Sequence, residues 1–484
     1  MLANPVASHP KTHPGLTRPA YLAAPEQRAQ VLAAMPQNSG VLQPAAALAL
    51  EGGTFAASGR GLVVVGAGSG ITRLDWGNGL VVGQSVALAG SPSFLAGGDL
   101  NGDGQNDVAA LQQDSATLSI AFGGTGGALS SSAQRPVSPN AEALLAGDLD
   151  GDCRDDLAFT TAGGSVQVLR QFKNGTLGSA LVADFPNGGA TDLAAGDLDH
   201  DGLPDLAALR GTGGETQQLA LFNLRNQNLR PAGARRVEDG GFAAHAVAVG
   251  DVTGDGRADV VVGAGGNIPD ALINIFPQSA GGLLATTPIT LSAWHLPEAV
   301  AVADLNHDGR NDIVALNSGW MALTLYLGQA DGSMAAYESY PLPYSAQYRP
   351  ETLAITDLNG DGGLDVLIAD GDRGATYLLN TSGAPSATIS GPAPCSFTGG
   401  TLTLSGSLTG ASALEVSLDG GGTWQAASVS GGTWSYTASL PKGFYPVVLA
   451  RAVSGGRVQA PPAELRLRGV PDHGDIYLPI VPRA

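Results

Sequence analysis

The chain has 484 residues, which is enough for two or more domains with hydrophobic cores of their own. Its 70 glycines and 30 prolines, with few aromatic residues, are typical of many short strands joined by tight turns. The 43 acidic residues outnumber the 24 basic ones, and the formal charge of −19 argues against binding to nucleic acid phosphates. No apolar stretch is long enough for a transmembrane segment.

Residues 1–43 form the first predicted unit, an N-terminal segment rich in proline and alanine. It has neither the basic region nor the apolar run of a secretory signal peptide, so no signal peptide is evident. Residues 44–89 then offer four apolar segments of strand length. These predicted strands are Pro44–Glu51, Gly61–Gly68, Ile71–Trp76 and Leu80–Ala89, with Gly52–Arg60 as the connection between the first two.

The next part of the chain is organised by a nine-residue acidic stretch that occurs six times. These copies begin 49 to 54 residues apart, and a fixed period in this range indicates a repeat architecture. An apolar segment of strand length follows each copy, so each repeat is predicted to be a strand–loop–strand unit. The copies, named acidic loops 1 to 6, are Asp99–Asp107, Asp148–Asp156, Asp197–Asp205, Asp251–Asp259, Asp304–Asp312 and Asp357–Asp365.

Each loop places oxygen-bearing side chains at its first, third, fifth and ninth positions, and its seventh position offers a backbone carbonyl. This donor set suits a hard cation that takes about six to eight oxygen ligands, which predicts Ca²⁺ at up to six sites. Without an ion, carboxylates packed so closely would repel one another. The predicted ligands are Asp99, Asn101, Asp103, Gln105 and Asp107 in loop 1; Asp148, Asp150, Asp152, Arg154 and Asp156 in loop 2; Asp197, Asp199, Asp201, Leu203 and Asp205 in loop 3; Asp251, Thr253, Asp255, Arg257 and Asp259 in loop 4; Asp304, Asn306, Asp308, Arg310 and Asp312 in loop 5; and Asp357, Asn359, Asp361, Gly363 and Asp365 in loop 6.

A helix–loop–helix calcium hand is excluded, because its loop needs a glutamate at the twelfth position. Counted from the start of each acidic loop, that position holds Ala110, Phe159, Ala208, Val262, Ala315 or Ile368. None of these side chains can bind a hard cation. The acidic loops are therefore predicted to lie between strands.

The loop pattern resembles the FG-GAP or VCBS repeats of integrin alpha-subunit propellers and of many secreted bacterial proteins. The segment Ala121–Gly127, which contains Phe122 and Gly123, is similar to the phrase that names the repeat. The resemblance covers residues 44–382 and implies an all-β fold, a β-propeller with calcium held between the first and second strands of each blade. Six loop-bearing units and the unit at residues 44–89 make seven blades, with six as the alternative.

The last repeat stops near Asn380 and lacks an outer strand. A propeller has to close its ring, because an unpaired edge leaves backbone donors and acceptors exposed. We therefore expect Leu16–Ala23 of the N-terminal segment to pair with the last blade.

Residues 383–469 form a linker and a second predicted domain. Alternating apolar segments separated by turn residues predict a small β-sandwich. The segments Glu415–Gln425 and Trp434–Val453 resemble those of bacterial immunoglobulin-like domains. Residues 470–484 form an apolar C-terminal tail that is too short to span a membrane.

Some residues depart from the repeat pattern. The sixth loop position needs a sharp turn and is glycine in five loops, but it is Cys153 in loop 2, which we expect to be among the weaker sites. Cys153 and Cys395 lie in different predicted domains and are not expected to pair. His200 and His307 occupy the fourth position and are interpreted as solvated loop residues.

The sequence has no G-x-S-x-G elbow, H-E-x-x-H pair or phosphate-binding loop. It therefore predicts a calcium-binding module for binding or adhesion without catalysis. Because calcium is abundant outside cells, the module is expected to be secreted or at the cell surface, with an extracellular protein or polysaccharide as its partner. A secreted polysaccharide-active enzyme, a lyase or glycosidase, is the alternative, and a structural repeat protein with no discrete ligand is a third hypothesis.

Three late repeats carry aromatic and charged residues where the other repeats have glycine-rich connections, at the end of the ring opposite the acidic loops. Exposed aromatic residues beside arginine are typical of ligand hot spots, whereas capping of the central channel or packing between blades is the alternative interpretation. The candidate ligand-binding residues are Trp294, His295, Trp320, Tyr344, Tyr348, Arg349, Asp372 and Arg373.

Overall fold

The computed structural model describes most of residues 41–467. The exceptions are residues 44–45, 49–54, 58–62, 68, 89, 113–114, 131–133, 186–188, 211–217, 226–227, 241, 268, 318–321, 343–351, 371–373, 381–384, 393–395, 397–399, 441–446, 456 and 460–461. Apart from a 3-10 turn at Thr125–Gly127, the regular structure in the described residues is β-strand, which confirms the predicted all-β fold. None of the described residues belongs to a helix long and apolar enough to cross a membrane.

The described residues between 46 and 378 form seven antiparallel sheets, numbered here in chain order. Sheet 1 contains β2 (Phe55–Ala57), β3 (Val63–Ala67), β4 (Gly70–Trp76) and β5 (Leu80–Ala87). Sheet 2 contains β6 (Phe94–Gly98), β7 (Asp107–Gln112), β8 (Thr117–Gly123) and β10 (Gln134–Pro136), with β9 (Leu129–Ser130) beside β8. Sheet 3 contains β11 (Ala141–Gly147), β12 (Asp156–Thr161), β13 (Ser165–Leu169) and β14 (Leu181–Asp184). Sheet 4 contains β15 (Asp192–Gly196), β16 (Asp205–Leu209), β17 (Gln218–Arg225) and β18 (Asn228–Arg236).

The remaining three sheets follow the same order of strands. Sheet 5 contains β19 (Ala244–Gly250), β20 (Asp259–Ala264), β21 (Leu272–Phe276) and β22 (Ile289–Ser292). Sheet 6 contains β23 (Pro297–Ala303), β24 (Asp312–Asn317), β25 (Ala322–Tyr326) and β26 (Glu338–Pro341). Sheet 7 contains β27 (Leu353–Thr356), β28 (Asp365–Asp370), β29 (Gly374–Leu378) and, as its fourth strand, β1 (Ala46–Leu48).

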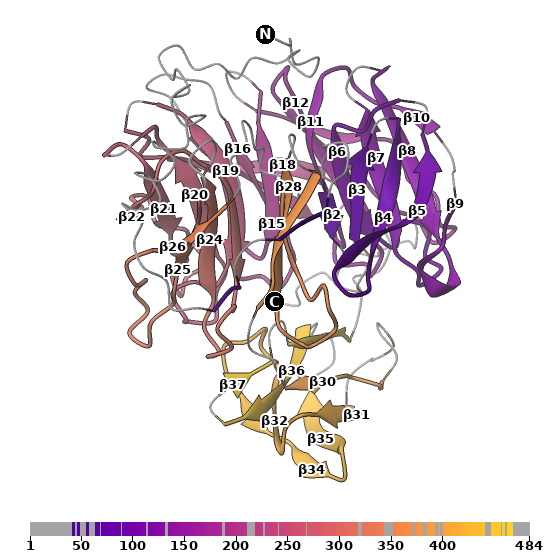
Figure 1. Cartoon of the computed structure of the whole chain (residues 1–484), viewed down its shortest axis with the longest axis vertical. Helices are drawn as coiled ribbons and strands as arrows, with labels where there is room; N and C mark the ends of the chain where they lie inside the picture. The colour runs from indigo at the N-terminus through magenta and orange to yellow at the C-terminus, as the bar shows by residue number, and fades with distance from the viewer. Residues whose placement is uncertain are drawn as a thin grey trace, which may run out of the picture.

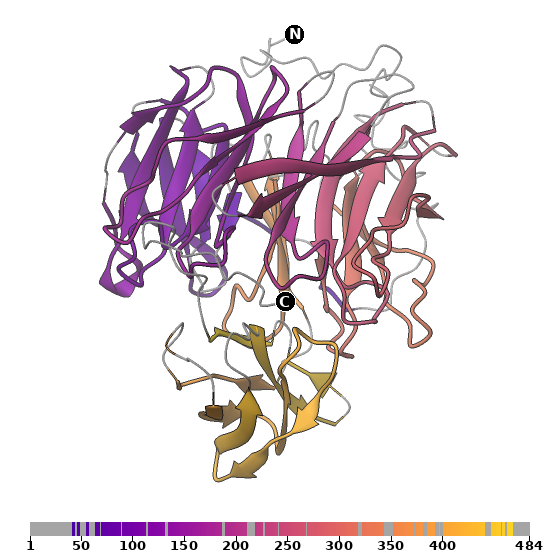
Figure 2. The ribbon, with the colours of Figure 1, turned by 180° about the vertical axis from the view of Figure 1, so that it is seen from behind.

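The seven sheets are arranged in a closed ring (Figures 1 and 2). Their first strands contact one another in succession, from β2 through β6, β11, β15, β19, β23 and β27 and back to β2. A ring of this kind is a β-propeller. The second strands are buried along their whole length in sheets 2 to 6, because each is covered on both faces by neighbouring sheets.

The ring closes through β1, which pairs with β29 in the register Ala46 with Tyr377 and Leu48 with Ala375. The predicted role of Pro44–Glu51 as the first strand of the first blade is therefore wrong, since that position belongs to β2 inside the predicted connection Gly52–Arg60. The predicted closing strand, Leu16–Ala23, lies outside the described residues. An apolar run predicts a strand but does not predict which edge it will pair with.

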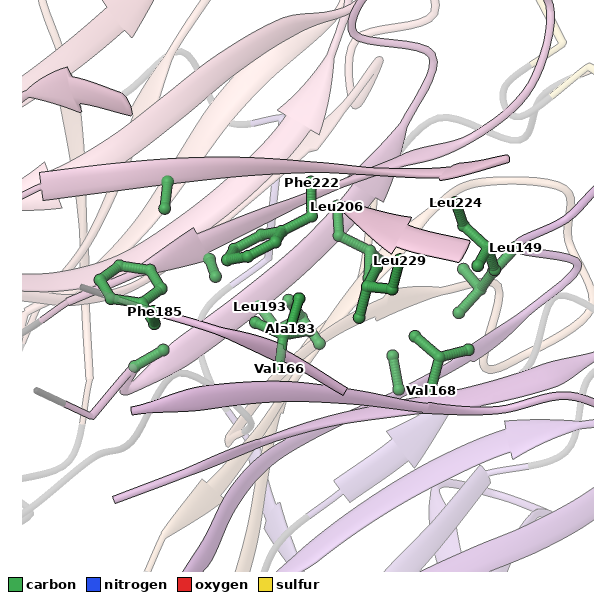
Figure 3. Packing of buried hydrophobic residues seen from close by; sticks show 14 of the residues in the cluster. Leu149, Val166, Val168, Ala183, Phe185, Leu193, Leu206, Phe222, Leu224 and Leu229 are labelled. Carbon is green, nitrogen blue, oxygen red and sulfur yellow. The ribbon is translucent and has the colours of Figure 1, made fainter. Parts of the chain in front are cut away.

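Apolar side chains fill the space between neighbouring sheets. Figure 3 shows one such cluster, in which Val166 and Val168 of sheet 3 pack near Leu206 and Phe222 of sheet 4. The rings of Phe185 and Phe222 lie 6.0 Å apart. Burial of each large apolar side chain contributes about 1.5–3 kcal/mol, so this packing holds the sheets face to face. As a result, the six acidic loops, which connect the first and second strands of sheets 2 to 7, lie at one end of the ring.

The C-terminal part forms two further sheets around a core of their own, which contains Leu404, Trp434 and Val448. The predicted β-sandwich is therefore present among the described residues, while its likeness to immunoglobulin domains stays a prediction. One sheet contains β30 (Ser386–Ala387), β31 (Gly400–Thr409), β35 (Thr433–Leu440) and β34 (Ser428–Ser430), and the other contains β33 (Gln425–Ala426), β32 (Ala413–Ser417), β36 (Val447–Ser454), β37 (Arg457–Val458) and β38 (Ala463–Arg466).

The C-terminal sandwich lies against the end of the ring that carries the acidic loops (Figure 1). The backbone N–H of Val458 donates to the carbonyl of His307 in loop 5, at 2.8 Å. A Cβ added to Gly256 of loop 4 would lie 2.3 Å from the Cα of Gly422, so these two backbones also touch. The sandwich therefore covers part of loops 4 and 5.

Candidate metal-binding loops

The six acidic loops occupy the same place in six sheets, between the first and second strands. In each loop the ninth residue is also the first residue of the second strand, as with Asp107 in β7 and Asp312 in β24. The second residue is apolar and buried in every loop, which anchors the start of the loop in the core between sheets. These anchors are Leu100, Leu149, Leu198, Val252, Leu305 and Leu358.

All six loops share one set of backbone hydrogen bonds to their carboxylates. The N–H at position six donates to Oδ2 of the first aspartate at 2.7–3.0 Å, and the N–H at position two donates to Oδ2 of the ninth at 2.8–3.3 Å. The N–H at position seven donates to Oδ1 of the fifth at 2.8–3.0 Å. These bonds hold the side chains of the loop around one centre, and a carboxylate oxygen has a second lone pair for a cation.

The turn at position six requires a left-handed backbone. Its φ is +82° at Gly104 and +88° at Gly362, and Cys153 adopts +70° at the same place. A residue with a Cβ costs about 1–2 kcal/mol in this conformation, which explains why glycine occupies the position in the other five loops. Cys153 therefore takes the backbone conformation that favours glycine, while the lower strength of the loop 2 site stays a prediction.

The donor atoms fit a hard cation. In loop 2 the carboxylates of Asp148, Asp150 and Asp156 offer oxygens that lie within 4.8 Å of one another, and in loop 3 those of Asp197, Asp199 and Asp205 do the same. The ninth-position aspartates are almost completely buried, with 0–2% of their surface exposed. Burial of a carboxylate is costly unless a cation or strong hydrogen bonds compensate it. The six loops are therefore suited to bind divalent ions such as calcium.

Burial also changes the acidity of these carboxyls. It raises the pKa of Asp107 and of Asp365 to about 6, and that of Asp312 to about 7, although backbone N–H groups lower each of them. In Asp156 burial and the neighbouring Asp150 raise the pKa further. Metal-free loops therefore retain protons near neutral pH, and a divalent ion would have to displace them.

Side-chain amides of the next sheet support several loops, a feature that the loop pattern alone did not predict. The Nε2 of Gln171 in sheet 3 donates to the carbonyl of Asp99 in sheet 2 at 2.7 Å. Gln278 in sheet 5 makes the same bond to Asp197 in sheet 4 at 2.8 Å, and Asn380 beyond β29 donates to the carbonyl of Leu305 at 2.6 Å. The available signal was an amide residue two positions after an apolar third strand, which the three share.

The predicted ligand-binding residues are only partly described. Trp294 is buried, with 7% of its surface exposed, and its ring packs edge-on against that of His295 at 4.7 Å. Trp294 is therefore not the exposed aromatic that was predicted. Burial lowers the pKa of His295 to about 4. Trp320, Tyr344, Tyr348, Arg349, Asp372 and Arg373 lie outside the described residues.

Two expectations about individual residues are wrong. Cys153 is disulfide-bonded, and the sequence has only one other cysteine, Cys395, which lies outside the described residues. The expectation that the two cysteines do not pair therefore fails, because separation along the sequence does not decide which residues meet in the fold. His307 is fully buried instead of solvated, because the C-terminal sandwich covers its loop. His200, at the equivalent position of loop 3, is exposed.

Repeated strand–acidic loop–strand units in a closed ring of antiparallel sheets define a repeat β-propeller. A sequence model described as the FG-GAP-like repeat matches residues 99–159, 148–208 and 304–368, and one described as the FG-GAP repeat matches residues 243–281. The chain therefore contains FG-GAP repeats in this part of its sequence. A comparison with curated proteins finds no match.

Proposed function

We propose that this protein is a calcium-dependent binding or adhesion module that acts outside the cell or at its surface. FG-GAP repeats are typical of integrin-like binding propellers. The observation that carries the proposal is the identical hydrogen-bonded frame of the six acidic loops, which holds carboxylates around a common centre in each. A frame repeated this closely is expected of loops that share the geometry of one kind of cation site.

Calcium would have a structural part in this function. When bound, it would neutralise the buried ninth-position carboxylates and join the start of a loop to the second strand. Because Gln171 and Gln278 connect a loop to the next sheet, stiffening of the loops would also stiffen the ring. The result is a rigid scaffold whose opposite end can present a binding surface.

The chemistry of the chain favours an extracellular location. Calcium loops of ordinary affinity are filled most easily where calcium is abundant, outside the cell. The disulfide at Cys153 supports the same location, because disulfides persist in oxidising compartments.

We place the binding surface at the end of the ring opposite the acidic loops. The C-terminal sandwich covers part of loops 4 and 5 at the other end, which reduces the surface available to a partner there. The expected partner is an extracellular protein or a polysaccharide, bound by the aromatic and charged residues that the sequence predicts for this surface.

The proposal is tested with an array of extracellular proteins and glycans, probed with the full chain in calcium and again in EDTA. We expect binding in calcium that is lost in EDTA and restored when calcium is added back. A Tyr348→Ala variant should lose the binding while keeping the Tm of the wild type, whereas Leu283→Ala, at an exposed position beside the acidic loops, should keep both. Binding that is unaffected by EDTA, or turnover of a glycan on the array, would contradict the proposal.

A further inference from the structure

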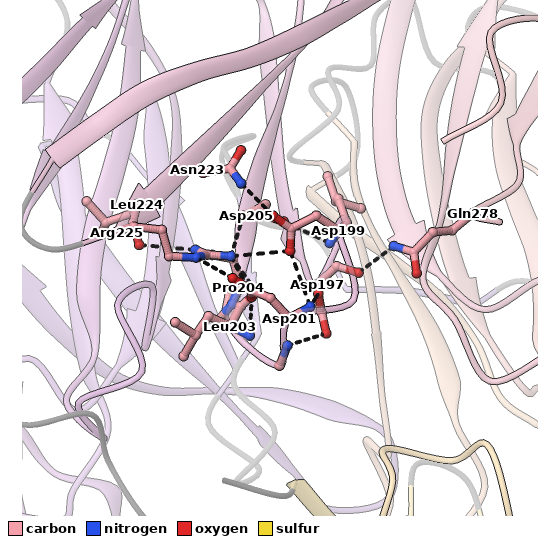
Figure 4. Close-up of polar contacts among 12 residues, drawn as sticks. Asp197, Asp199, Asp201, Leu203, Pro204, Asp205, Asn223, Leu224, Arg225 and Gln278 are labelled. Carbon is pink, nitrogen blue, oxygen red and sulfur yellow. Dashed lines mark hydrogen bonds and ion pairs between the residues drawn. The ribbon is translucent and has the colours of Figure 1, made fainter. Parts of the chain in front are cut away.

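Loop 3 differs from the other loops because an arginine reaches into it. Arg225 is the last residue of β17, and Figure 4 shows its guanidinium among the predicted ligands. Its Nη2 lies 2.7 Å from Oδ1 of Asp201 and 2.8 Å from Oδ1 of Asp205. The same nitrogen is 3.5 Å from Oδ1 of Asp199 and 3.4 Å from the carbonyl of Leu203. Nη2 of Arg225 thus lies within 3.5 Å of an oxygen atom from four of the five predicted ligands.

The shape of sheet 4 brings the arginine to this place. In β17 the strand continues for three residues beyond Phe222, which pairs with Leu206 at the start of the second strand. The equivalent third strands of sheets 3, 5 and 6 end at Leu169, Phe276 and Tyr326. The extra residues of β17 pair with β18 as far as Asn228, which holds Arg225 beside its own loop.

At the ninth-position aspartate of loop 3, the arginine occupies the place of a backbone N–H donor that is present in the other five loops. In the other five loops, Oδ1 of this aspartate accepts a backbone N–H from the chain after the third strand or at its end, as from Gly123 to Asp107 at 2.7 Å. In loop 3 the Oδ1 of Asp205 accepts from the guanidinium of Arg225. Asn223, the residue opposite Asp205, donates to Oδ2 of Asp199 at 2.6 Å. Side-chain donors therefore already surround the centre of this loop.

The number of carboxylates per loop sets loops 2 and 3 apart from the other four. Loops 2 and 3 have an aspartate at position three, whereas the other loops have Asn101, Thr253, Asn306 or Asn359 there. These two loops, each with a fourth carboxylate, are also the ones in which an arginine at or just after the end of the third strand contacts the ligands. In loop 2, Arg170 forms an ion pair with Asp150 but its Nη2 is 3.8 Å from Asp152. The arginine of loop 2 therefore pairs most closely with Asp150, whereas Nη2 of Arg225 lies within 3.5 Å of oxygens of four predicted ligands of loop 3.

We propose that Arg225 takes the place of calcium in loop 3, so that this loop is a permanent, metal-independent clamp within a calcium-dependent ring. The inference rests on the proposed binding of calcium by the other loops. A guanidinium stays positively charged at all physiological pH values and offers five N–H donors, so it can satisfy several carboxylate oxygens at once. Sheet 4 then keeps its loop ordered when calcium is removed.

The test is the number of calcium ions bound per chain, measured by equilibrium dialysis at saturating calcium with the full protein. Arg225→Leu should bind a single ion more than the wild type, because the emptied centre leaves four carboxylates. Arg235→Leu, on the neighbouring strand β18, is the matched control, since Arg235 donates to the backbone carbonyls of Leu284 and Ala285, and its loss should add no ion. An unchanged count in Arg225→Leu would overturn the proposal.

A second pair of variants tests the wild-type loop directly, whether or not Arg225→Leu folds. Asp201→Ala removes the fifth-position ligand of loop 3 and should leave the number of bound ions unchanged. Asp361→Ala removes the equivalent ligand of loop 6 and should lower calcium binding by one site or weaken it at least tenfold. A lower count in Asp201→Ala would overturn the inference about Arg225 alone. A wild type that binds no calcium at all would overturn the proposed function, and this inference with it.

Discussion

The side chain of Gln171 connects two sheets by donating from its Nε2 to the backbone carbonyl of Asp99, at 2.7 Å. Gln171 is fully buried in sheet 3, and Asp99 is the first predicted ligand of loop 1 in sheet 2. The bond therefore holds the start of loop 1 against the neighbouring sheet.

Replacement of Gln171 by leucine should lower stability, because the carbonyl of Asp99 would lose its donor inside the protein. An unsatisfied buried acceptor costs about 1–3 kcal/mol. The check is a lower Tm by calorimetry, and Gln278→Leu, which breaks the equivalent bond to Asp197, should behave alike. A wild-type Tm in both variants would show that these amides do not support the ring.

The closing strand can be tested at Leu42, which precedes β1 and is 3% exposed in a cluster with Val366 and Leu378. Leu42→Ala should lower the free energy of unfolding by about 2–5 kcal/mol, the range for loss of a buried leucine. The neighbouring Gln43 is exposed and bonds through its backbone N–H to Leu379, so Gln43→Ala should have little effect. Equal effects of the two substitutions would argue against closure by this segment.

Gly282 tests the contact between loop 3 and the hairpin of the next sheet. A Cβ at Gly282 would lie 1.9 Å from the carbonyl of Asp199, so Gly282→Ala should force sheet 5 away from the loop. Gly254 has the same φ of +72° but no atom within 4 Å of an added Cβ. Gly254→Ala should therefore show only the cost of a left-handed alanine, about 1 kcal/mol. We expect a clearly lower Tm for Gly282→Ala than for Gly254→Ala, and similar values would contradict the contact.

The raised pKa values predict how pH affects the metal-free protein. Burial raises the pKa of Asp107 to about 6 and that of Asp312 to about 7, from a usual value of 3.8. The folded state therefore holds these protons more tightly than the unfolded chain, and the stability they contribute is lost as the pH rises through the folded-state values. The Tm of metal-free protein should fall between about pH 5 and about pH 8.

Calcium should reverse this trend, because it competes with protons for the same oxygens and binds more tightly as the carboxyls ionise. The stabilisation by a fixed calcium concentration should therefore grow over the same pH interval. Calorimetry on dialysed protein with and without calcium measures both effects. A metal-free Tm that rises with pH would contradict the assigned pKa shifts.

Much of the site was predictable from the sequence, because the acidic loops carry their chemistry in nine contiguous residues. The spacing of Asp99, Asp103 and Asp107 and the glycine at position six are local requirements of a turn that gathers oxygens. The strands around each loop follow from short apolar runs, and the all-β fold follows from them.

The remaining features depend on which distant residues meet in the fold. The partner of β1 was missed because an apolar run does not specify the edge it joins. Arg225 was missed because it stands twenty residues after Asp205 and reaches the loop only through the long hairpin of β17 and β18. The burial of His307 was missed for a similar reason, since a separate domain covers it.

The most direct test of the central claim is thermal unfolding of the full chain over a range of free calcium concentrations, with EDTA as the zero point. An ion that binds only the folded state raises stability in proportion to the logarithm of its concentration above its Kd. We predict a Tm that is lowest in EDTA and rises steadily with calcium, but not with the same concentrations of potassium. An identical Tm in EDTA and in saturating calcium would contradict the account.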